Sequence, residues 1–148
     1  MNTNRKAFLD MIATSEGTIN LGDNGYNVVV GGTLFDSYTD HPRQLVRLNP
    51  KLSSTAAGRY QLLARYYDSY KKSLDLPDFS PDSQDQIALQ QIKECRAIAD
   101  IDLGHFDEAV RKCAHIWASL PGAGYGQHEN SLSKLRAAYT AAGGTITA

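Results

Sequence analysis

The chain has 148 residues, 42% hydrophobic and 21% charged, which is long enough for one compact domain with a real core and excludes a disordered protein. The formal charge of −1, with Lys and Arg interspersed among Asp and Glu, offers no basic patch, so we expect no nucleic-acid partner. No apolar stretch approaches the roughly 20 residues that span a bilayer, and Asp10 interrupts the segment in which a signal peptide would need apolar residues. We therefore expect a single domain over residues 1–148, without stable membrane insertion, that stays in the cytoplasm unless something else releases it.

The first predicted helix covers residues 6–15, where apolar residues recur on one helical face, and Gly17 is well placed to end it. Glu16 then lies at the helix C-terminus, where the negative end of the helix dipole favours the protonated acid. This effect is worth only about 0.3 to 1 kcal/mol, and most terminal glutamates are simply solvated. Position alone therefore does not make Glu16 catalytic.

Residues 21–48 differ from the rest in carrying turn signals around the β-branched run Val28, Val29 and Val30. This pattern predicts a small antiparallel sheet or hairpin in that segment. A loop over residues 49–57 follows.

Helical patterns occupy most of the remaining chain. Apolar and aromatic residues recur at helical spacing over 62–74, and Ser80 with Pro81 indicates the cap and first residue of a helix that continues to residue 95. A further amphipathic helix is predicted over 106–117, and Ser131 is the expected cap of a last helix through residue 139.

Several residues that could carry chemistry have more ordinary interpretations. The glycine-rich loop 121–126 does not match a phosphate-binding loop, and the four histidines lack metal-ligand spacing, so we expect no metal site. Cys95 and Cys113 lack CxxC spacing and are interpreted as reduced thiols, although the sequence leaves a disulfide between them open. Tyr60 and Gln61 could contact a sugar, but packing and solvent exposure are the commoner roles of such residues.

Nine segments, taken together and in order, resemble the lambda-type bacteriophage endolysins, which are lytic transglycosylases with a lysozyme fold. They are RKAFLDM, SEGT, GYNVVVGG, DHPRQLV, LNPKL, AGRYQLL, DFSP, ALQQIKE and IWASLPGAGYGQ. The resemblance spans nearly the whole chain. It implies a mostly helical α+β protein, lysozyme-like, with a small antiparallel sheet and a substrate cleft between.

The resemblance also implies site residues. The glutamate of SEGT corresponds to Glu16, which becomes the expected catalytic acid/base. The Gly-x-x-Gln element of the wider transglycosylase group corresponds to residues 58–61 and points to Gln61 as a substrate-binding residue. Tyr60, at the start of its predicted helix, is the aromatic residue that we expect to contact the sugar in the cleft. Tyr125 and Gln127 belong to a segment that resembles the mobile upper lip of the family, and residues 49–58 would supply the lower lip.

This sequence also departs from the family pattern. Thr14 stands where a family relative has tryptophan, and the segment between residues 17 and 26 is shortened. These departures concern the outer wall of the cleft more than the chemistry.

The function implied is cleavage of the β-1,4 bond between N-acetylmuramic acid and N-acetylglucosamine in peptidoglycan glycan strands, giving a 1,6-anhydro product and host lysis. Because Glu16 must hold its proton near neutral pH for this, we expect burial to raise its pKa. The resemblance implies no cofactor, a monomer, and passage from the host cytoplasm to the periplasm through a holin lesion.

Two other functions stay open. A hydrolytic muramidase would need a second carboxylate opposite Glu16, for which Asp36 or Asp40 is the candidate. A non-catalytic peptidoglycan-binding protein would bind the cell wall without clearing its turbidity.

Overall fold

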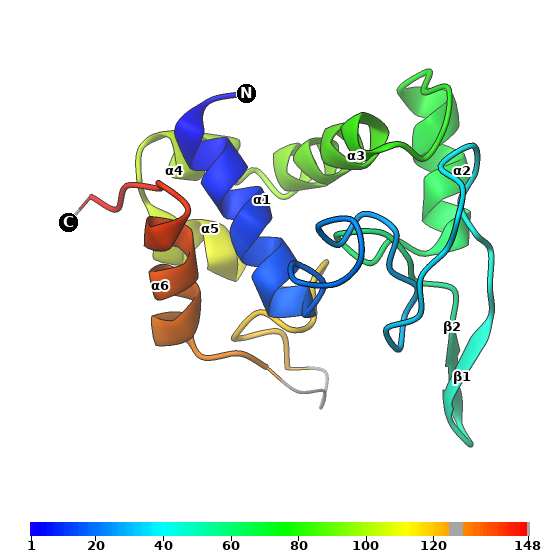
Figure 1. Cartoon of the computed structure of the whole chain (residues 1–148). Coiled ribbons are helices and arrows are strands. Elements are labelled where there is room, and N and C mark those ends of the chain that lie inside the picture. Colours follow the sequence, from blue (N-terminus) through cyan, green and yellow to red (C-terminus); the bar gives the residue numbers. More distant parts are fainter. Residues whose placement is uncertain (125–128, 148) are drawn as a thin grey trace. The chain divides into compact units, whose positions relative to one another are not determined.

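The computed structural model describes residues 1–124 and 129–147 (Figure 1). It divides into two compact units, of which the first joins Met1–Gly17 to Ala88–Ala148 and the second is Thr18–Ile87. Both ends of the chain thus belong to the first unit. The expectation of a single domain over residues 1–148 stays a prediction.

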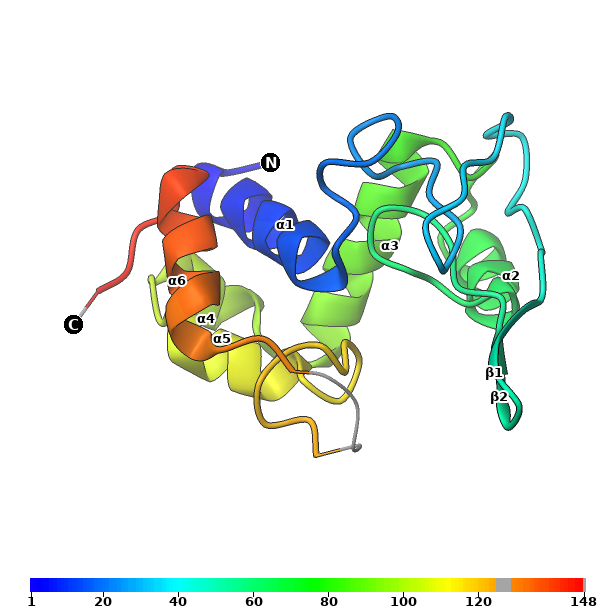
Figure 2. The same cartoon turned by 60° about the horizontal axis from the view of Figure 1, so that its bottom comes forward.

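The first unit is helical. It contains α1 (Thr3–Glu16), the second half of α3 (Pro81–Glu94), α4 (Ile98–Asp102), α5 (Phe106–Cys113) and α6 (Leu132–Ala141). In Figures 1 and 2, α1 runs alongside α6 and packs against α4, which in turn contacts α5. This arrangement packs α1 against helices from distant parts of the chain.

Three aromatic rings meet in the core of this bundle. Phe8 of α1 packs on Phe106 of α5 and on Tyr139 of α6, with ring centroids 6.0 and 6.5 Å apart, and the Phe106 and Tyr139 rings are 4.6 Å apart. All three side chains are almost completely buried. Aromatic contacts of this kind contribute beyond the apolar area that they bury, so they fix α1 against both partner helices.

The predicted helices of this unit are confirmed, with shifted ends. The first begins at Thr3 rather than at residue 6 because Oδ1 of Asn2 accepts a hydrogen bond of 2.8 Å from the Arg5 amide. It ends at Glu16, and Gly17 follows with φ 79°, as a glycine after a helix commonly does. The helix predicted over 106–117 stops at Cys113, whose carbonyl oxygen accepts two turn hydrogen bonds from the following residues. The sequence did not predict α4.

The second unit contains a two-stranded sheet and helical segments. Its elements are β1 (Val46–Asn49), β2 (Leu52–Ser54), α2 (Ala64–Ser73) and the first half of α3. The start of α3 is as predicted, because Pro81 is its first residue and Oγ of Ser80 accepts a hydrogen bond of 3.4 Å from the Ser83 amide.

The predicted position of the sheet was only partly right: Val28 pairs with Leu34 in an isolated antiparallel bridge within the predicted segment, but the two-stranded sheet lies later in the chain. The antiparallel pairing joins β1 to β2, with Val46 opposite Ser54, inside the region predicted partly as loop. Val28 and Val29 form only isolated bridges and are 2% and 0% exposed. Their apolar character therefore serves the core, whereas β1 and β2 are mostly exposed and lack the alternation that identifies a strand.

The core of this unit gathers around Phe79 at the turn before α3. It comprises Val29, Phe35, Ala57, Leu62, Tyr67, Leu76, Phe79 and Ile87. His41 packs against the rings of Tyr67 and Phe79, accepts the Arg43 amide at Nδ1 and lies 2.8 Å through Nε2 from the Leu62 carbonyl oxygen. Burial lowers the pKa of His41, so this histidine is a neutral core residue.

Candidate active site

Glu16 is the last residue of α1 and is only partly exposed. Its Oε2 accepts a hydrogen bond of 2.5 Å from the hydroxyl of Ser119, a residue in the turns that follow α5. In the described part of the chain, Oε1 has no hydrogen-bond partner. One carboxylate oxygen is therefore held by the protein, and the other is available to a ligand.

Ser119 is itself fixed by a short chain of hydrogen bonds. Its hydroxyl oxygen lies 2.8 Å from the hydroxyl oxygen of Ser15. The Ser15 hydroxyl in turn accepts a hydrogen bond of 3.1 Å from the side-chain amide of Asn130. The same amide donates to the Ser15 carbonyl oxygen at 2.9 Å, and the Asn130 backbone amide donates to the Ser119 carbonyl oxygen at 2.8 Å. Ser15 and Asn130 are each only 7% exposed.

The donor and acceptor in each hydrogen bond of this network can be assigned. Because Ser119 gives its single hydroxyl proton to Glu16, the bond between the two serines requires Ser15 to donate to Ser119. Ser15 can do so because its own oxygen accepts from Asn130. Oδ1 of Asn130 accepts from Lys134 at 3.0 Å, which fixes the amide with its nitrogen toward Ser15. Asn130 thus donates to Ser15, Ser15 to Ser119, and Ser119 to the Glu16 carboxylate.

Burial raises the pKa of Glu16 from its ordinary value near 4.5 to about 7, and the hydrogen bond from Ser119 acts in the opposite direction by favouring the carboxylate. Desolvation is the larger effect, because water cannot reach the buried carboxylate to stabilise its charge. The carboxyl group is therefore held close to equal populations of its two forms at neutral pH.

The second candidate element is the turn over residues 58–61 of the second unit. Gln61 has φ 53°, and its side-chain nitrogen donates to the carbonyl oxygens of Gly58 at 2.9 Å and Val28 at 3.3 Å. Its amide oxygen has no partner among the described residues. A fixed amide with a free acceptor can receive a hydrogen bond from a ligand N–H or hydroxyl group.

Gln84 of α3 holds this turn from beneath. Its side-chain oxygen accepts from the Arg59 amide at 2.9 Å, and its nitrogen donates to the carbonyl oxygens of Tyr26 and Phe79 at 3.0 and 2.9 Å. Gly58 has φ 85°, and a Cβ there would lie 2.5 Å from the Gln84 oxygen. The glycine is therefore required both by the backbone conformation and by the close approach of α3.

Tyr60 is 5% exposed and donates a hydrogen bond of 2.6 Å from its hydroxyl to Asp85. Tyr26 donates to the same carboxylate at 2.9 Å, and the guanidinium of Arg59 lies over both rings. Burial raises the pKa of Asp85, and the hydrogen bonds from these two tyrosine hydroxyls act in the opposite direction by favouring the carboxylate. In this arrangement Tyr60 supports the turn that carries Gln61.

The remaining predicted site residues, Tyr125 and Gln127, lie outside the described residues. Beside them, the Glu129 carboxylate accepts hydrogen bonds of 3.0 Å from the backbone amides of Gly122 and Gly124. These two amides lower the pKa of Glu129, so its side chain is a carboxylate and not a neutral acid at neutral pH.

A model of the endolysin family matches residues 6–146, which is nearly the whole chain. The chain belongs to the endolysin family. It is 59% identical to the endolysin of Escherichia phage lambda, over 99% of this chain and 95% of that protein. The endolysin of Escherichia phage P2 is 48% identical, over 95% of this chain and 93% of that one.

Solved structures of family members establish the fold. The lysozyme of bacteriophage lambda complexed with a chitohexasaccharide matches with a TM-score of 0.97 and 58% identity, over 99% of this chain and 98% of that one. A second structure of lambda lysozyme matches with a TM-score of 0.93 over the same shares. The predicted α+β lysozyme-like class is thereby confirmed for this member of the endolysin family, as is the predicted family.

Sequence reasoning did not assign a role to Ser15, Ser119 or Asn130. Ser15 lies in the SEGT segment and Ser119 in IWASLPGAGYGQ, so two of the segments that carry the family resemblance contain the network around Glu16. The signal was therefore present in those motifs. Asn130 lies outside every one of the nine segments and had no signal in the sequence.

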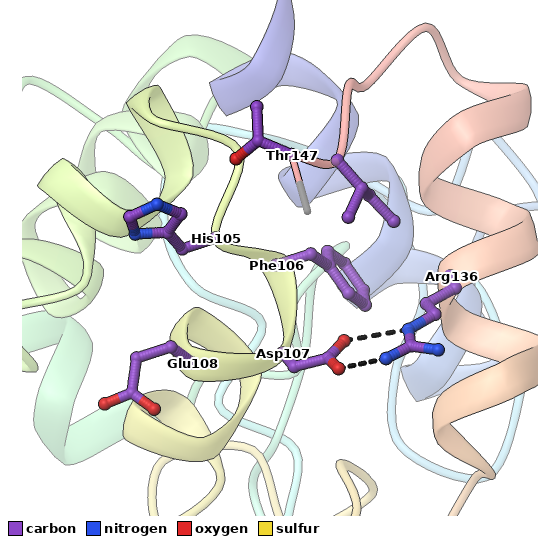
Figure 3. A pocket seen from close by; sticks show the side chains of 7 residues that line it. His105, Phe106, Asp107, Glu108, Arg136 and Thr147 are labelled. Atoms are coloured by element: carbon purple, nitrogen blue, oxygen red, sulfur yellow. Dashed lines mark hydrogen bonds and ion pairs between the residues drawn. The ribbon is translucent and has the colours of Figure 1, made fainter.

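A pocket of about 660 Å³ lies elsewhere in the first unit and contains none of the predicted site residues. Figure 3 shows the paired side chains of Asp107 and Arg136 on one side of it, with His105 and Thr147 on the other. The Arg136 guanidinium and the Asp107 carboxylate at its edge are paired with each other.

Within residues 1–124 and 129–147, no three His, Cys, Asp or Glu side chains are grouped closely enough to hold a metal ion. Over the same residues, no helix combines the length and apolar character that crossing a membrane requires.

Proposed function

We propose that this protein is a lytic transglycosylase that cuts the β-1,4 bond between N-acetylmuramic acid and N-acetylglucosamine in peptidoglycan. The observation that carries this proposal is the position of Glu16, buried enough to have a pKa of about 7 and oriented through one oxygen by Ser119. The family membership and the chitohexasaccharide bound to lambda lysozyme agree with a glycan substrate.

In the first step, protonated Glu16 donates its proton to the glycosidic oxygen as the bond from that oxygen to C1 of the muramic residue breaks. A pKa near the working pH makes the proton both present and transferable. General acid catalysis of this kind contributes about 10² to 10⁴-fold. The free Oε1 is the atom that makes this contact, since Oε2 is held by Ser119.

In the second step, the Glu16 carboxylate accepts the proton of the muramic 6-hydroxyl as O6 attacks C1. The product is a 1,6-anhydro sugar, and no water is consumed. Intramolecular attack contributes roughly 7 to 11 kcal/mol through effective molarity, which offsets the absence of a second carboxylate. The Ser119 hydroxyl stabilises the anion that exists between the two steps.

The residues proposed to bind the substrate lie in the turn around Gln61 and in the glycine-rich segment 121–127. The free amide oxygen of Gln61 would accept a hydrogen bond from an N-acetyl N–H or a sugar hydroxyl. Tyr60 would position this turn and contribute at most its 5% exposed surface to a sugar. Tyr125 and Gln127 are the proposed contacts from the glycine-rich segment.

In the cell, the proposed role is host lysis at the end of a phage infection. The protein would act as a monomer without cofactor, accumulate in the host cytoplasm and reach the periplasm through a holin lesion. Glycan cleavage there would remove the mechanical support of the cell wall.

A hydrolytic muramidase is the second candidate. It would require a carboxylate that activates water, and inverting and retaining glycosidases both use such a second acid. Asp40 is poorly suited because Arg43 binds it at 2.9 Å and holds its pKa below the ordinary value. Asp36 is exposed, with no partner among the described residues, and is the one acid predicted for this role that is not engaged.

The experiment that tests catalysis by Glu16 compares clearance of a peptidoglycan suspension by the wild type and by Glu16→Gln. We expect clearance to fall by at least about 10²-fold in the variant, with pelleting on the cell wall unchanged. Glu108→Gln is the matched control, because Glu108 is an exposed residue paired with Arg111, and it should retain full activity. Full clearance by Glu16→Gln would remove Glu16 from the mechanism, and binding without clearance by the wild type would favour the non-catalytic alternative.

A further inference from the structure

The two cysteines of the chain lie against each other in the first unit. Cys95 directly follows the last residue of α3 and Cys113 is the last residue of α5. The sulfur of Cys95 lies 4.0 Å from Nε2 of His115, two residues beyond Cys113, and the two thiols are close enough to shift each other's pKa. Both are free thiols in this structure. Cys95 is partly exposed and Cys113 is buried, so only one of the pair can be reached by a molecule from solvent.

Neighbouring residues hold the ends of α3 and α5 in this position. Nζ of Lys112 donates to the carbonyl oxygen of Arg96 at 3.2 Å and to the Asp100 carboxylate at 2.7 Å. The residue before Cys113 is thus tied to the residue after Cys95. The contacts of Lys112 therefore stabilise the junction between the C-terminal ends of α3 and α5, where the two thiols lie.

The surroundings of Cys95 favour its reaction. Its sulfur lies 4.0 Å from Nε2 of His115, which can accept a proton. The neighbouring Cys113 lowers the pKa of the Cys95 thiol, whereas the pKa of Cys113 is raised by Cys95 and by burial. Cys95 is accordingly the more readily ionised thiol of the two.

We propose that Cys95 and Cys113 form an intramolecular disulfide in the presence of a small disulfide oxidant, with Cys95 as the attacking thiol and Cys113 as the resolving thiol. The bond would join the C-terminal ends of α3 and α5. It would add a covalent link to the junction that Lys112 now holds by a hydrogen bond to Arg96 and an ion pair with Asp100.

The chemistry is two successive thiol–disulfide exchanges. The Cys95 thiolate, its proton passed to His115 or water, attacks one sulfur of oxidised glutathione, so that the glutathione S–S bond breaks and one reduced glutathione leaves. Cys113 then loses its proton and attacks Cys95 Sγ in the mixed disulfide, releasing the second glutathione. Two protein thiol protons and two electrons have passed to the oxidant, which leaves as two thiols.

The setting for this reaction rests on the function proposed above. Thiols stay reduced in a bacterial cytoplasm, and disulfides persist in the periplasm. A protein that passes from the cytoplasm to the periplasm would therefore form the disulfide between Cys95 and Cys113 once it reaches the periplasm. The cross-link would restrict the unfolded chain between positions 95 and 113 and make the protein more resistant to unfolding outside the cell membrane.

The test incubates the purified, folded protein with excess oxidised glutathione, followed by denaturing alkylation and intact-mass measurement. We expect the wild type to lose two hydrogen atoms, take up no alkyl group and stay monomeric. Cys113→Ser should stop at a stable glutathione adduct on Cys95. Cys95→Ser should carry no glutathione and take up one alkyl group on denaturation, because the buried Cys113 does not react in the folded protein. Cys113→Ala serves in place of Cys113→Ser if the latter does not fold, as judged by circular dichroism.

Oxidation should also raise the melting temperature of the wild type by about 5 to 10 °C and leave that of Cys95→Ser unchanged. Two alkylated cysteines, a lasting glutathione adduct or a disulfide-linked dimer in the oxidised wild type would each overturn the proposal. So would an adduct on Cys113 in Cys95→Ser. None of these readouts uses peptidoglycan, so their failure is distinguishable from failure of the proposed function.

Discussion

The hydroxyl of Ser119 donates a hydrogen bond of 2.5 Å to Oε2 of Glu16, although the two residues are 103 positions apart in the chain. This bond favours the carboxylate, whereas burial of the same group favours the acid. The two effects together leave the pKa of Glu16 at about 7. Ser119 is thus a positioning residue that also limits how far the pKa rises.

Substitution Ser119→Ala should therefore raise the pKa of Glu16 further, because the carboxylate loses its donor while burial persists. We expect kcat to fall about tenfold and the upper limb of the pH–activity profile to move to higher pH. The profile and an NMR titration of Glu16 measure this. Ser133→Ala, on the exposed face of α6, is the control and should leave both unchanged. A loss of activity without any shift of the profile would mean that Ser119 acts only through packing.

The buried carboxyl group also predicts how stability depends on pH. In the folded protein Glu16 keeps its proton up to about pH 7, whereas in the unfolded chain it releases the proton near 4.5. The stability that the protonated group contributes is complete below pH 4.5 and is lost as the pH rises through 7. At pH 8 the wild type should be less stable than Glu16→Gln by about 3 kcal/mol, since each pKa unit is worth about 1.36 kcal/mol.

Urea unfolding of both proteins at pH 4 and pH 8 measures this difference. We expect Glu16→Gln to match the wild type at pH 4 and to exceed it at pH 8, while being inactive at both. A stability difference that is the same at the two pH values would show that Glu16 has no raised pKa in the folded protein.

Asn130 should matter for both stability and activity. Asn130→Ala removes the donor to Ser15 and leaves the Ser15 carbonyl oxygen buried without that partner, which costs about 1 to 3 kcal/mol of unfolding free energy. Ser119 then loses the directed chain that orients its hydroxyl, so kcat should fall as well. Chemical denaturation and clearance assays test this. Ser131→Ala, next in the chain, removes only the cap of α6 and should reduce stability by about 1 kcal/mol without affecting kcat.

The turn that carries Gln61 depends on Gln84, which makes three hydrogen bonds while only 3% exposed. Gln84→Ala should lower the unfolding free energy by about 2 to 3 kcal/mol, because buried backbone groups lose their partner. Gln86, also on α3, pairs only with Asp82 at the surface, so Gln86→Ala should cost less than about 0.5 kcal/mol. Equal effects of the two substitutions would contradict the role given to Gln84.

Much of the fold could be predicted because its signals are local. Gly17 ends α1, Ser80 with Pro81 begins α3 and Ser131 caps α6, and each of these depends on hydrogen bonds within a few residues. The short helix α4 has no side-chain cap and was missed. The sheet was misplaced because its strands are mostly exposed and carry little apolar pattern.

The candidate site could be predicted only in part, because its contacts are long-range. The resemblance pointed to Glu16, but its pKa depends on how deeply the folded chain buries it, which no local pattern encodes. The contact between Asn130 and Ser15 joins residues 115 positions apart. Tyr60, expected at the surface of a sugar site, is instead held by Asp85 beneath the turn, and its binding role stays a prediction.

The measurement that tests the central claim most directly is mass spectrometry of the soluble fragments released from purified peptidoglycan, with Glu16→Gln as the blank. Muropeptides lighter by one water than their reducing counterparts, absent from the blank, are the predicted result and would establish 1,6-anhydro products formed by Glu16. Fragments with reducing ends would contradict transglycosylation and direct the search to a second carboxylate, beginning with Asp36.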